Sequence, residues 1–380
     1  MPAAPNAATV TAGPKPNGMH EMTKIRIGVI GAGLIGRKHL RKLAEHGDYE
    51  LAGIADVNAE QVAAEQPGAR VFAEYRKLLD EARPEAVIIA SPNQLHAENG
   101  IAWARADIHI LIEKPVTDTL ETAAGLIAEV RKAGIRSLVG HHRRHHRQVK
   151  ALKALLGEGR IGDVVGVSAI WATHKPADYF KAAPWRSQAG GGPILINLIH
   201  EIDFLRFAVG EIVAVEAIAA NRQRGFAVED TAAALLEFEN GALGTFFLSD
   251  CAVTPWTMEQ GLGEAPEFPF SGQSSYRLMG RRGAIEFPSL DQWTQEGGAQ
   301  DWNRPIQAQA NHAASIDPYV AQLDHFRDVV RGVTPSLQPV EDGARSLLVT
   351  LAIAEAATAR RRIDLRERYA ALGQGEQTTT

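Results

Sequence analysis

The sequence predicts an α/β protein with a doubly wound parallel sheet in the first half of the chain and an α+β domain with antiparallel strands in the second. From Lys24 onward, short apolar runs alternate with helical segments, and a glycine-rich turn joins the first run to a helix, which is typical of parallel βαβ units. The second half has longer strand patterns, few crossovers and the hairpin signal Asn240-Gly241.

The elements follow in order from apolar periodicity. Strands of the parallel sheet are predicted over 25–30, 51–55, 87–90, 109–112 and 137–139, with helices over 34–46, 94–106 and 119–133 between them. In the second half, strands are predicted over 164–172, 232–239 and 242–248, the last two joined by a type I′ turn, and helices over 194–209, 319–330 and 342–362.

Four segments are predicted along the chain. Residues 1–22 lack a period and are rich in Ala, Pro, Asn and Gly, so they predict a mobile tail, and residues 363–380 predict a second tail. The two domains between them span 23–140 and 141–362, with the last helix able to pack back on the first domain. The Pro-, Gly- and Glu-rich segment 254–273 predicts a long loop, and long ordered loops often serve function.

Composition narrows the class of protein. The chain has 40 basic and 45 acidic residues, a formal net charge of −5, which argues against a general nucleic-acid binder. The single cysteine, Cys251, excludes an intramolecular disulfide, and neither a signal peptide nor a membrane span is recognisable. These features predict a cytoplasmic protein that binds neither nucleic acid nor membrane.

A dinucleotide fingerprint follows the first strand. Gly31, Gly33 and Gly36, with Leu34 and Ile35 between the last two, form a G-x-G-x-x-G turn that opens a helix, where bare backbone can approach a pyrophosphate. Asp56 stands twenty positions later, at the end of the second strand. A carboxylate there accepts hydrogen bonds from ribose hydroxyls and repels a 2′-phosphate, which predicts NAD as the cofactor.

Polar residues also end two further strands of the parallel sheet, at the edge where such sheets bind ligands. Ser91 and Asn93 are predicted to contact the cofactor, although an Asx turn explains Asn93 equally well. His96 belongs to the same loop, where a role in supporting the loop is favoured. Glu113-Lys114-Pro115 ends the strand 109–112, and desolvation there would make Lys114 a useful donor to a substrate oxygen, although alone the tripeptide fits a surface turn equally well.

A glycine run precedes the second half of the predicted site. Asn197 and His200 follow Gly190-Gly191-Gly192 at i and i+3 of one helix, so both can face the same cleft. An alcohol loses a proton as it loses hydride, and histidine titrates near neutrality. His200 is therefore the predicted base.

The chain resembles the Gfo/Idh/MocA oxidoreductases over nearly all of residues 24–362. The resemblance rests on the glycine fingerprint and on motifs spread through both halves, which are Ser91-Pro92-Asn93 with His96, Glu113-Lys114-Pro115, residues 140–144, Arg160-Ile161-Gly162, Trp185-Arg186 and the glycine-run helix. It implies an NAD-binding Rossmann domain over 23–140 and a substrate and oligomerisation domain on an open-faced, largely antiparallel sheet. It also implies that Lys114 and His200 are catalytic, that Glu113 lies in the cofactor site, that Trp185 and Arg186 border the nicotinamide, and that the substrate is a sugar, cyclitol or related alcohol.

One departure and one alternative concern the substrate side. Many family members have Asp four residues before the histidine, whereas here that residue is Ile196, so Asn197 is predicted to position substrate in its place.

The run 141–147 contains four histidines but lacks an accompanying carboxylate pattern, so no metal site is predicted. His142 and Arg144 are predicted to contact substrate, and the other charges of the run to be solvated. Lys175, with His174, can reach the cleft from a strand end, and Tyr179, Trp256 and Tyr319 fit either sugar stacking or core packing.

These residues predict an NAD-dependent dehydrogenase of a sugar or cyclitol, with His200 as base and Lys114 stabilising the alkoxide. Two alternatives stay open at this point, an NAD-dependent glycosidase that oxidises its substrate transiently and a non-catalytic cofactor-binding regulator. An exposed sheet face predicts a homodimer or homotetramer.

Overall fold

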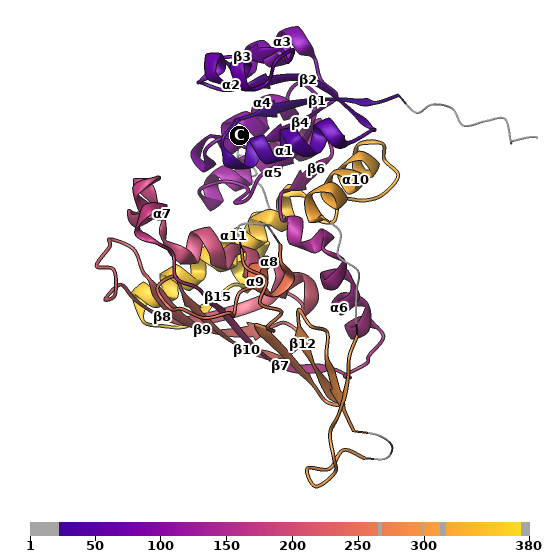
Figure 1. Cartoon of the computed structure of the whole chain (residues 1–380), viewed down its shortest axis with the longest axis vertical. Coiled ribbons are helices and arrows are strands. Elements are labelled where there is room, and N and C mark those ends of the chain that lie inside the picture. The colour runs from indigo at the N-terminus through magenta and orange to yellow at the C-terminus, as the bar shows by residue number, and fades with distance from the viewer. Residues whose placement is uncertain (1–22, 265–267, 296, 298, 312–316, 374–380) are drawn as a thin grey trace, which may run out of the picture.

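The computed structural model describes residues 23–264, 268–295, 297, 299–311 and 317–373, so the predicted tail 1–22 lies outside it. Its N-terminal half contains a six-stranded parallel sheet of order β3-β2-β1-β4-β5-β6 (Figure 1). The strands are β1 Ile25–Ile30, β2 Tyr49–Ala55, β3 Val71–Phe72, β4 Ala86–Ile89, β5 His109–Ile112 and β6 Ser137–Val139. The order reverses between β1 and β4, which places a ligand crevice at the carboxyl ends of the strands.

The helices of this half are α1 Leu34–Glu45, α2 Ala59–Glu65, α3 Tyr75–Ala82, α4 His96–Ala104 and α5 Leu120–Ala133. The elements α2, β3 and α3 were not predicted. They are short, and β3 has two half-buried residues, so its periodic signal is too brief to separate from a loop.

The C-terminal half is built on a nine-stranded mixed sheet of order β14-β13-β12-β11-β7-β10-β9-β8-β15. Only β7 and β10 pair in parallel, and the other neighbours are antiparallel, which confirms the largely antiparallel prediction. The strands are β7 Val164–Ala172, β8 Ile212–Ala220, β9 Thr231–Phe238, β10 Leu243–Ser249, β11 Tyr276–Gly280, β12 Gly283–Phe287, β13 Gln292–Thr294, β14 Gln307–Gln309 and β15 Ile363–Asp364.

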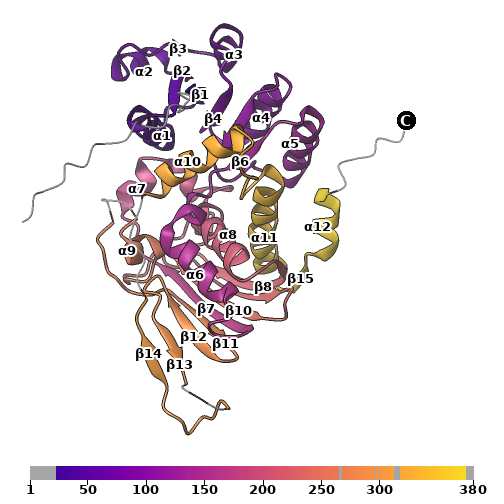
Figure 2. The same cartoon turned by 90° about the vertical axis from the view of Figure 1, so that its right-hand side faces the viewer.

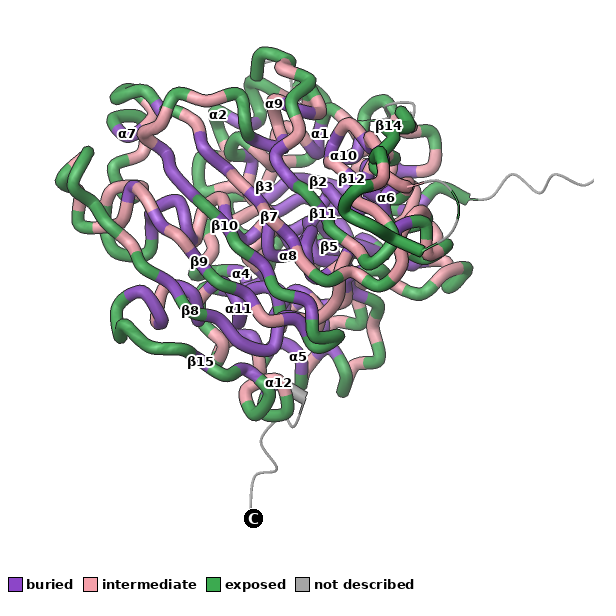
Figure 3. Tube along the Cα trace, turned by 90° about the horizontal axis from the view of Figure 1, so that it is seen from below, coloured by how far each residue is buried: buried purple, intermediate pink, exposed green. Residues whose placement is uncertain are grey.

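One face of this sheet is covered and the other is open. Helices α6 Arg147–Gly157, α8 Ile199–Ala208 and α11 Val340–Ala359 lie on the face toward the Rossmann sheet (Figures 1 and 2). Seen from the opposite side, buried and exposed residues alternate along the strands (Figure 3). Leu235 and Leu243 are 55% and 63% exposed on these strands, so apolar side chains remain uncovered in the chain by itself.

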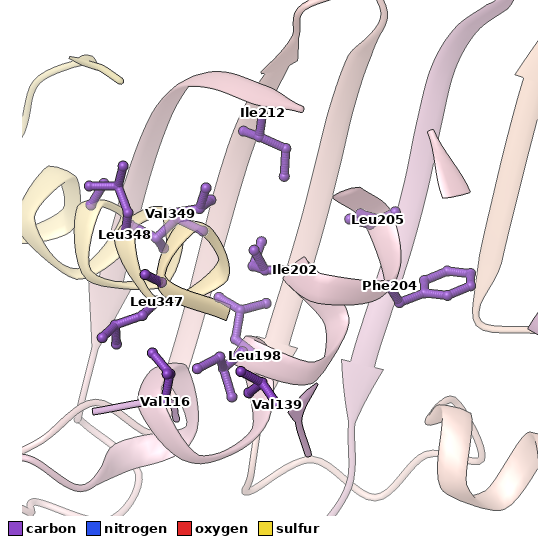
Figure 4. Packing of buried hydrophobic residues seen from close by; sticks show 14 of the residues in the cluster. Val116, Val139, Leu198, Ile202, Phe204, Leu205, Ile212, Leu347, Leu348 and Val349 are labelled. Atoms are coloured by element: carbon purple, nitrogen blue, oxygen red, sulfur yellow. The ribbon is translucent and has the colours of Figure 1, made fainter. Parts of the chain in front are cut away.

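The two halves share one apolar core (Figure 4). Val116 and Val139 of the Rossmann half gather with Leu198, Ile202 and Leu347 of the C-terminal half. Helix α10 Pro318–Val330 also packs back on the Rossmann sheet, since Leu323 and Phe326 belong to its second core cluster. This packing holds the crevice at the carboxyl ends of the Rossmann strands against the helices of the C-terminal half.

Three predictions of local structure were wrong. Only Gly241 of the hairpin pair has positive φ, so the β9–β10 turn is not type I′. The predicted loop 254–273 contains a helix, α9 Met258–Leu262. The Thr257 side chain caps its N-terminus by accepting a hydrogen bond from the Gln260 N–H. The expected tail from 363 forms β15 and α12 Arg366–Gly373 up to the end of the described residues, because buried apolar side chains at Ile363 and Leu365 anchor it.

In the part of the chain that the structure describes, no helix has the length and apolarity needed to cross a membrane.

Candidate active site

The glycine turn forms an open cradle at the start of α1. Gly31 has φ +85°, and a Cβ on it would meet the Ala90 carbonyl oxygen at 2.4 Å, so only glycine fits. A Cβ at Gly33 would meet nothing within 4 Å, so this side of the turn is open to a ligand. Helix α1 begins at Leu34 without a side-chain cap, which leaves backbone N–H groups of Leu34 and Ile35 at a helix N-terminus, where a pyrophosphate is favoured.

Asp56 lies against this cradle. Its Oδ2 accepts a hydrogen bond from the Ala32 backbone N–H at 2.6 Å, and its Oδ1 accepts one from Asn58 at 2.8 Å. The remaining lone pairs of the carboxylate are available to ribose hydroxyls. The turn and the carboxylate therefore fit the pyrophosphate and ribose of NAD.

The loop after β4 is held by His96. Its Nδ1 lies 2.8 Å from the Pro115 carbonyl oxygen and its Nε2 lies 2.8 Å from that of Ser91. Burial lowers the pKa of His96, and the ring ties the β4 loop to the β5 loop, which supports the structural role favoured for it. Ser91 Oγ accepts a hydrogen bond from Asn99, whereas the Asn93 side chain has no partner among the described residues.

Glu113 supports the site from behind. Its Oε1 lies 2.7 Å from His39 Nε2 of α1, and a Cβ on Gly140 would lie 2.8 Å from its carboxylate. Glu113 thus links the helix of the glycine turn to the strand that carries Lys114. Both carboxylate oxygens have protein donors, since Oε2 accepts the Lys114 backbone N–H at 3.3 Å, so this geometry gives no support to a direct cofactor contact.

Lys114 is half-buried at the carboxyl end of β5. Within the described residues its Nζ has neither a hydrogen-bond acceptor nor an ion-pair partner. Burial lowers the pKa of Lys114, opposed by the nearby charge of Glu113. An ammonium group left without a carboxylate is available to an oxygen of a bound substrate.

The predicted helix 194–209 has two parts. Ile194–Leu198 is a π-helical turn and Ile199–Ala208 is the α-helix α8. The π turn directly follows the glycine run, where Gly192 has φ +82° and the Ile194 N–H donates to Glu229 at 2.8 Å. Asn197 belongs to the π turn and His200 to the first turn of α8, and π turns are frequent at functional sites.

His200 is half-buried in a cationic environment. Burial and, next, the positive charge of Lys114 lower the pKa of His200 well below its ordinary range. The ring of His142 lies 5.5 Å away and that of His141 6.4 Å away, centroid to centroid. His200 Nδ1 is buried with no hydrogen-bond partner among the described residues. The imidazole is therefore neutral at pH 7 and able to accept a proton.

The interpretation of residues 141–147 as a largely solvated face was wrong. Arg143 is 3% exposed and is surrounded by three carboxylates, Glu201, Glu259 at 2.5 Å and Glu264 at 3.1 Å. Burial, opposed by Arg143 and reinforced by Glu259, raises the pKa of Glu201 to about 8. The segment lies between α8 and α10, where any charge must be paired.

Two substrate-contact predictions fall in the same segment. His142 Nε2 lies 2.5 Å from Glu264 Oε1, and its ring stacks on Tyr319 at 4.4 Å, so Tyr319 is a packing residue here. Arg144 is 4% exposed and donates to Asp203 at 2.6 and 2.9 Å. Its remaining contacts with Asp342 and a backbone carbonyl leave it no free face, so this geometry gives no support to Arg144 as a substrate contact.

Lys175 lies just beyond the end of β7 and reaches the π turn. Its Nζ donates to Asn197 Oδ1 at 2.6 Å and lies 3.9 Å from Asp250 Oδ2. Burial lowers the pKa of Lys175 to about 8, with Asp250 opposing. On the same side, Arg186 lies over the Tyr179 ring at 3.9 Å, and Trp185 is 49% exposed.

The structure thus places Lys114, at the end of β5, near His200 of α8. Asn197 lies in the π turn before α8, and Lys175 reaches it from the segment after β7. Sequence reasoning missed the Arg143 cluster and the partners of Lys175. The signal available was weak, namely Glu259 and Glu264 of the 254–273 loop and the charged run itself.

Two family models match the chain. The model described as an oxidoreductase family with an NAD-binding Rossmann fold matches residues 25–141, and the GFO/IDH/MocA C-terminal domain matches residues 149–286. The chain belongs to the Gfo/Idh/MocA family. It is an NAD(P)-dependent oxidoreductase of this family, as its sequence resemblance implies.

Individual relatives cover most of the chain. A 1,5-anhydro-D-fructose reductase of Ensifer adhaerens is 27% identical over 87% of this chain and 96% of its own. A myo-inositol 2-dehydrogenase of Thermotoga maritima is 31% identical over 60% of this chain and 70% of its own. The WlbA dehydrogenase of Bordetella pertussis, solved with NADH and UDP-GlcNAcA, superposes with a TM-score of 0.73 at 26% identity, covering 90% of this chain and 99% of WlbA.

Proposed function

We propose that the chain is an NAD-dependent dehydrogenase that oxidises a secondary hydroxyl of a sugar, a cyclitol or a related cyclic polyol. The observation that carries this proposal is the pairing of Lys114 and His200. The ammonium of Lys114 has no partner among the described residues, and burial together with this charge lowers the pKa of the neighbouring imidazole, so that it is neutral. A cationic donor beside a neutral base fits the removal of a proton from an alcohol.

The cofactor site is proposed from the residues that fit it. Gly31, Gly33 and Gly36 with the N-terminus of α1 would hold the pyrophosphate, and Asp56 the adenosine ribose. Ser91 and Asn93 at the β4 end, and Trp185 and Arg186 from the other half, are proposed to lie along the nicotinamide portion. When bound, NAD supplies the hydride acceptor.

The chain's own residues move the proton and stabilise charge. His200 takes the hydroxyl proton as the carbinol carbon is oxidised, and the Lys114 ammonium stabilises the oxygen on which negative charge develops. Asn197 contacts another oxygen of the substrate and orients it, and Lys175 supports Asn197 through the hydrogen bond to its amide oxygen. His142, whose Nε2 is held by Glu264, forms the wall behind His200.

The substrate class is supported by the relatives. The names of two of them specify an anhydro-sugar and a cyclitol, and the structure of a third contains a nucleotide sugar acid beside NADH. All of these molecules carry secondary hydroxyls on a six-membered ring. The same chemistry is therefore proposed for this chain.

The test is a panel of inositols, aldoses, anhydrosugars and glycosides incubated with NAD, following NADH absorbance and product release. Accumulation of NADH with a ring polyol supports the dehydrogenase. Release of an aglycone without net NADH would replace it by a glycosidase. No turnover of any compound, with NAD bound, would favour a cofactor-binding regulator.

We propose a homodimer or homotetramer assembled through the open face of the nine-stranded sheet. Leu235 and Leu243 are more than half exposed there, and Phe247 on β10 is 41% exposed. Apolar side chains exposed on an uncovered sheet face favour association with a second copy. Sedimentation of the wild type against Leu235→Asp tests it, since the charged variant should sediment as a monomer.

A further inference from the structure

The side-chain amide of Asn197 is held in one orientation by Lys175. Lys175 Nζ donates to Asn197 Oδ1 at 2.6 Å. An ammonium group has three donors and no acceptor, so the amide oxygen, and not the amide nitrogen, must face it. The Nδ2 group then points away from Lys175. Among the described residues it has no acceptor, and it is not among the buried polar atoms without partners.

Lys175 is itself fixed from several sides. Its backbone N–H donates to the Asp250 carbonyl at 2.9 Å, and its carbonyl accepts from Arg224 Nη2 at 2.8 Å. Its ammonium lies 5.4 Å from the Trp171 ring centroid and 4.8 Å from that of Tyr179. Lys175 is 8% exposed, so the orientation of the amide does not depend on a mobile surface lysine.

The polar groups beside Lys175 and Asn197 are donors or carboxylates that already accept a hydrogen bond, as Glu229 Oε1 does from the Ile194 N–H at 2.8 Å. Arg186 lies over the ring of Tyr179, which Lys175 also contacts. The Arg186 guanidinium has no carboxylate partner within the described residues. The nearby carboxylate of Asp250 is engaged by Arg224 at 2.6 Å. A hydroxyl placed here would have to find an acceptor for its own proton, whereas an ether or carboxylate oxygen would not.

We infer that Lys175 is a positioning residue that makes Asn197 a hydrogen-bond donor toward the substrate, so that this position selects an oxygen that accepts but cannot donate. This inference rests on the proposed function and narrows its substrate class. A pyranose ring oxygen or a carboxylate satisfies it, and the hydroxyl-bearing ring carbon of a cyclitol does not. Lys175 and Asn197 then distinguish sugars or sugar acids from cyclitols.

The test measures binding to the enzyme loaded with NADH, by calorimetry, so that it does not depend on turnover. The probes are 1,5-anhydro-D-glucitol, its carbocyclic analogue in which a CH(OH) group replaces the ring oxygen, and D-glucuronate. Wild type should bind an acceptor-only probe at least about fivefold more tightly than the carbocycle, as expected for one hydrogen bond. Preference for the anhydroglucitol assigns a ring oxygen, and a stronger preference for glucuronate assigns a carboxylate.

Four variants separate positioning from general structure. Lys175→Arg keeps a donor-only cation and should retain the preference, whereas Lys175→Met should abolish it. Asn197→Asp replaces the donor by an acceptor and should also abolish it. Lys181→Met, on the exposed side of α7 Ala177–Lys181, is the matched control and should behave as wild type. An unchanged preference in folded Lys175→Met protein overturns the inference.

A second measurement stands apart from substrate binding. In ¹⁵N-asparagine-labelled protein, the Asn197 side-chain resonances, identified by their absence in Asn197→Asp, should titrate near pH 8 with Lys175. Lys175→Met should remove that titration. If no probe binds, the proposed substrate class fails, while this titration still decides the orientation: its presence supports the inference, and a wild type without it overturns the inference.

Discussion

The Asp56 carboxylate accepts a hydrogen bond from the backbone N–H of Ala32 at 2.6 Å, joining the end of β2 to the glycine turn 24 residues earlier. The second oxygen is held by the Asn58 N–H, so the carboxylate cannot rotate away from the turn. A fixed negative charge at the position proposed for the adenosine ribose would accept hydrogen bonds from two hydroxyls and repel a 2′-phosphate.

The first prediction concerns cofactor choice. Wild type should prefer NAD over NADP by at least about tenfold in kcat/KM, roughly 1.4 kcal/mol, because of the Asp56 charge. Asp56→Ala should reduce this ratio by about tenfold or more. Steady-state rates with both cofactors measure it, and Glu60→Ala, an exposed carboxylate on the neighbouring α2, is the control. Equal or better turnover of NADP by wild type would contradict the assignment.

The second prediction concerns His200. His200→Ala should lose about 10²- to 10⁴-fold in kcat, the range that general acid–base groups contribute. Because the pKa of His200 is lowered, wild-type kcat in the oxidation direction should not fall between pH 8 and pH 6.5 through protonation of this group. His109→Ala, at the amino end of β5, is the control. Variant activity within about threefold of wild type would mean that another group takes the proton.

The sequence predicted the parts of the site that local rules determine. Gly31 to Gly36, Asp56 and Lys114 each follow a predicted strand of a parallel sheet, and strand ends converge at one edge by topology. His200 was found by its spacing from the glycine run. The roles of these residues stay predictions, while their placement follows from the fold.

What the sequence did not predict depends on packing between distant segments. Arg143 meets Glu201, Glu259 and Glu264, which are 58 to 121 residues away, so no local pattern links them. Residues Ile194–Leu198 form a π turn, and the spacing of apolar residues does not distinguish a π turn from an α-helical one. Lys175 and Asn197 likewise meet only because β7 ends beside this turn.

The third prediction tests the Arg143 cluster through stability. The folded-state pKa of Glu201 is raised from 4.5 to about 8, so the folded chain retains a proton that the unfolded chain releases. The contribution of this group to stability is therefore fully present below about pH 4.5 and is lost as pH rises toward 8. The side-chain amide in Glu201→Gln stays neutral across this pH range. The Tm of this variant relative to that of wild type should rise by at least about 2 °C between pH 5 and pH 8.5.

Scanning calorimetry across this pH range measures the difference between the two proteins. Glu50→Gln, an exposed side chain on β2, should follow wild type at every pH. A Glu201→Gln difference that stays constant from pH 5 to 8.5 would show that Glu201 is ionised throughout, with Arg143 outweighing its burial.

The last prediction separates chemistry from binding at Lys114. Its Nζ has no protein partner among the described residues, so Lys114→Ala removes no ion pair that holds the fold together. The pyrophosphate and ribose contacts proposed for NAD come from Gly31 to Gly36 and Asp56, so NAD affinity should stay within a few-fold of wild type. The ammonium acts on charge that grows as the alkoxide forms, and kcat should fall by at least about 10²-fold, roughly 2.7 kcal/mol. Calorimetry of NAD binding and steady-state rates are compared with those of Lys132→Ala, an exposed lysine on α5. Near-normal kcat with weakened NAD binding would make Lys114 a cofactor ligand, because an effect on binding alone leaves the barrier of the chemical step unchanged.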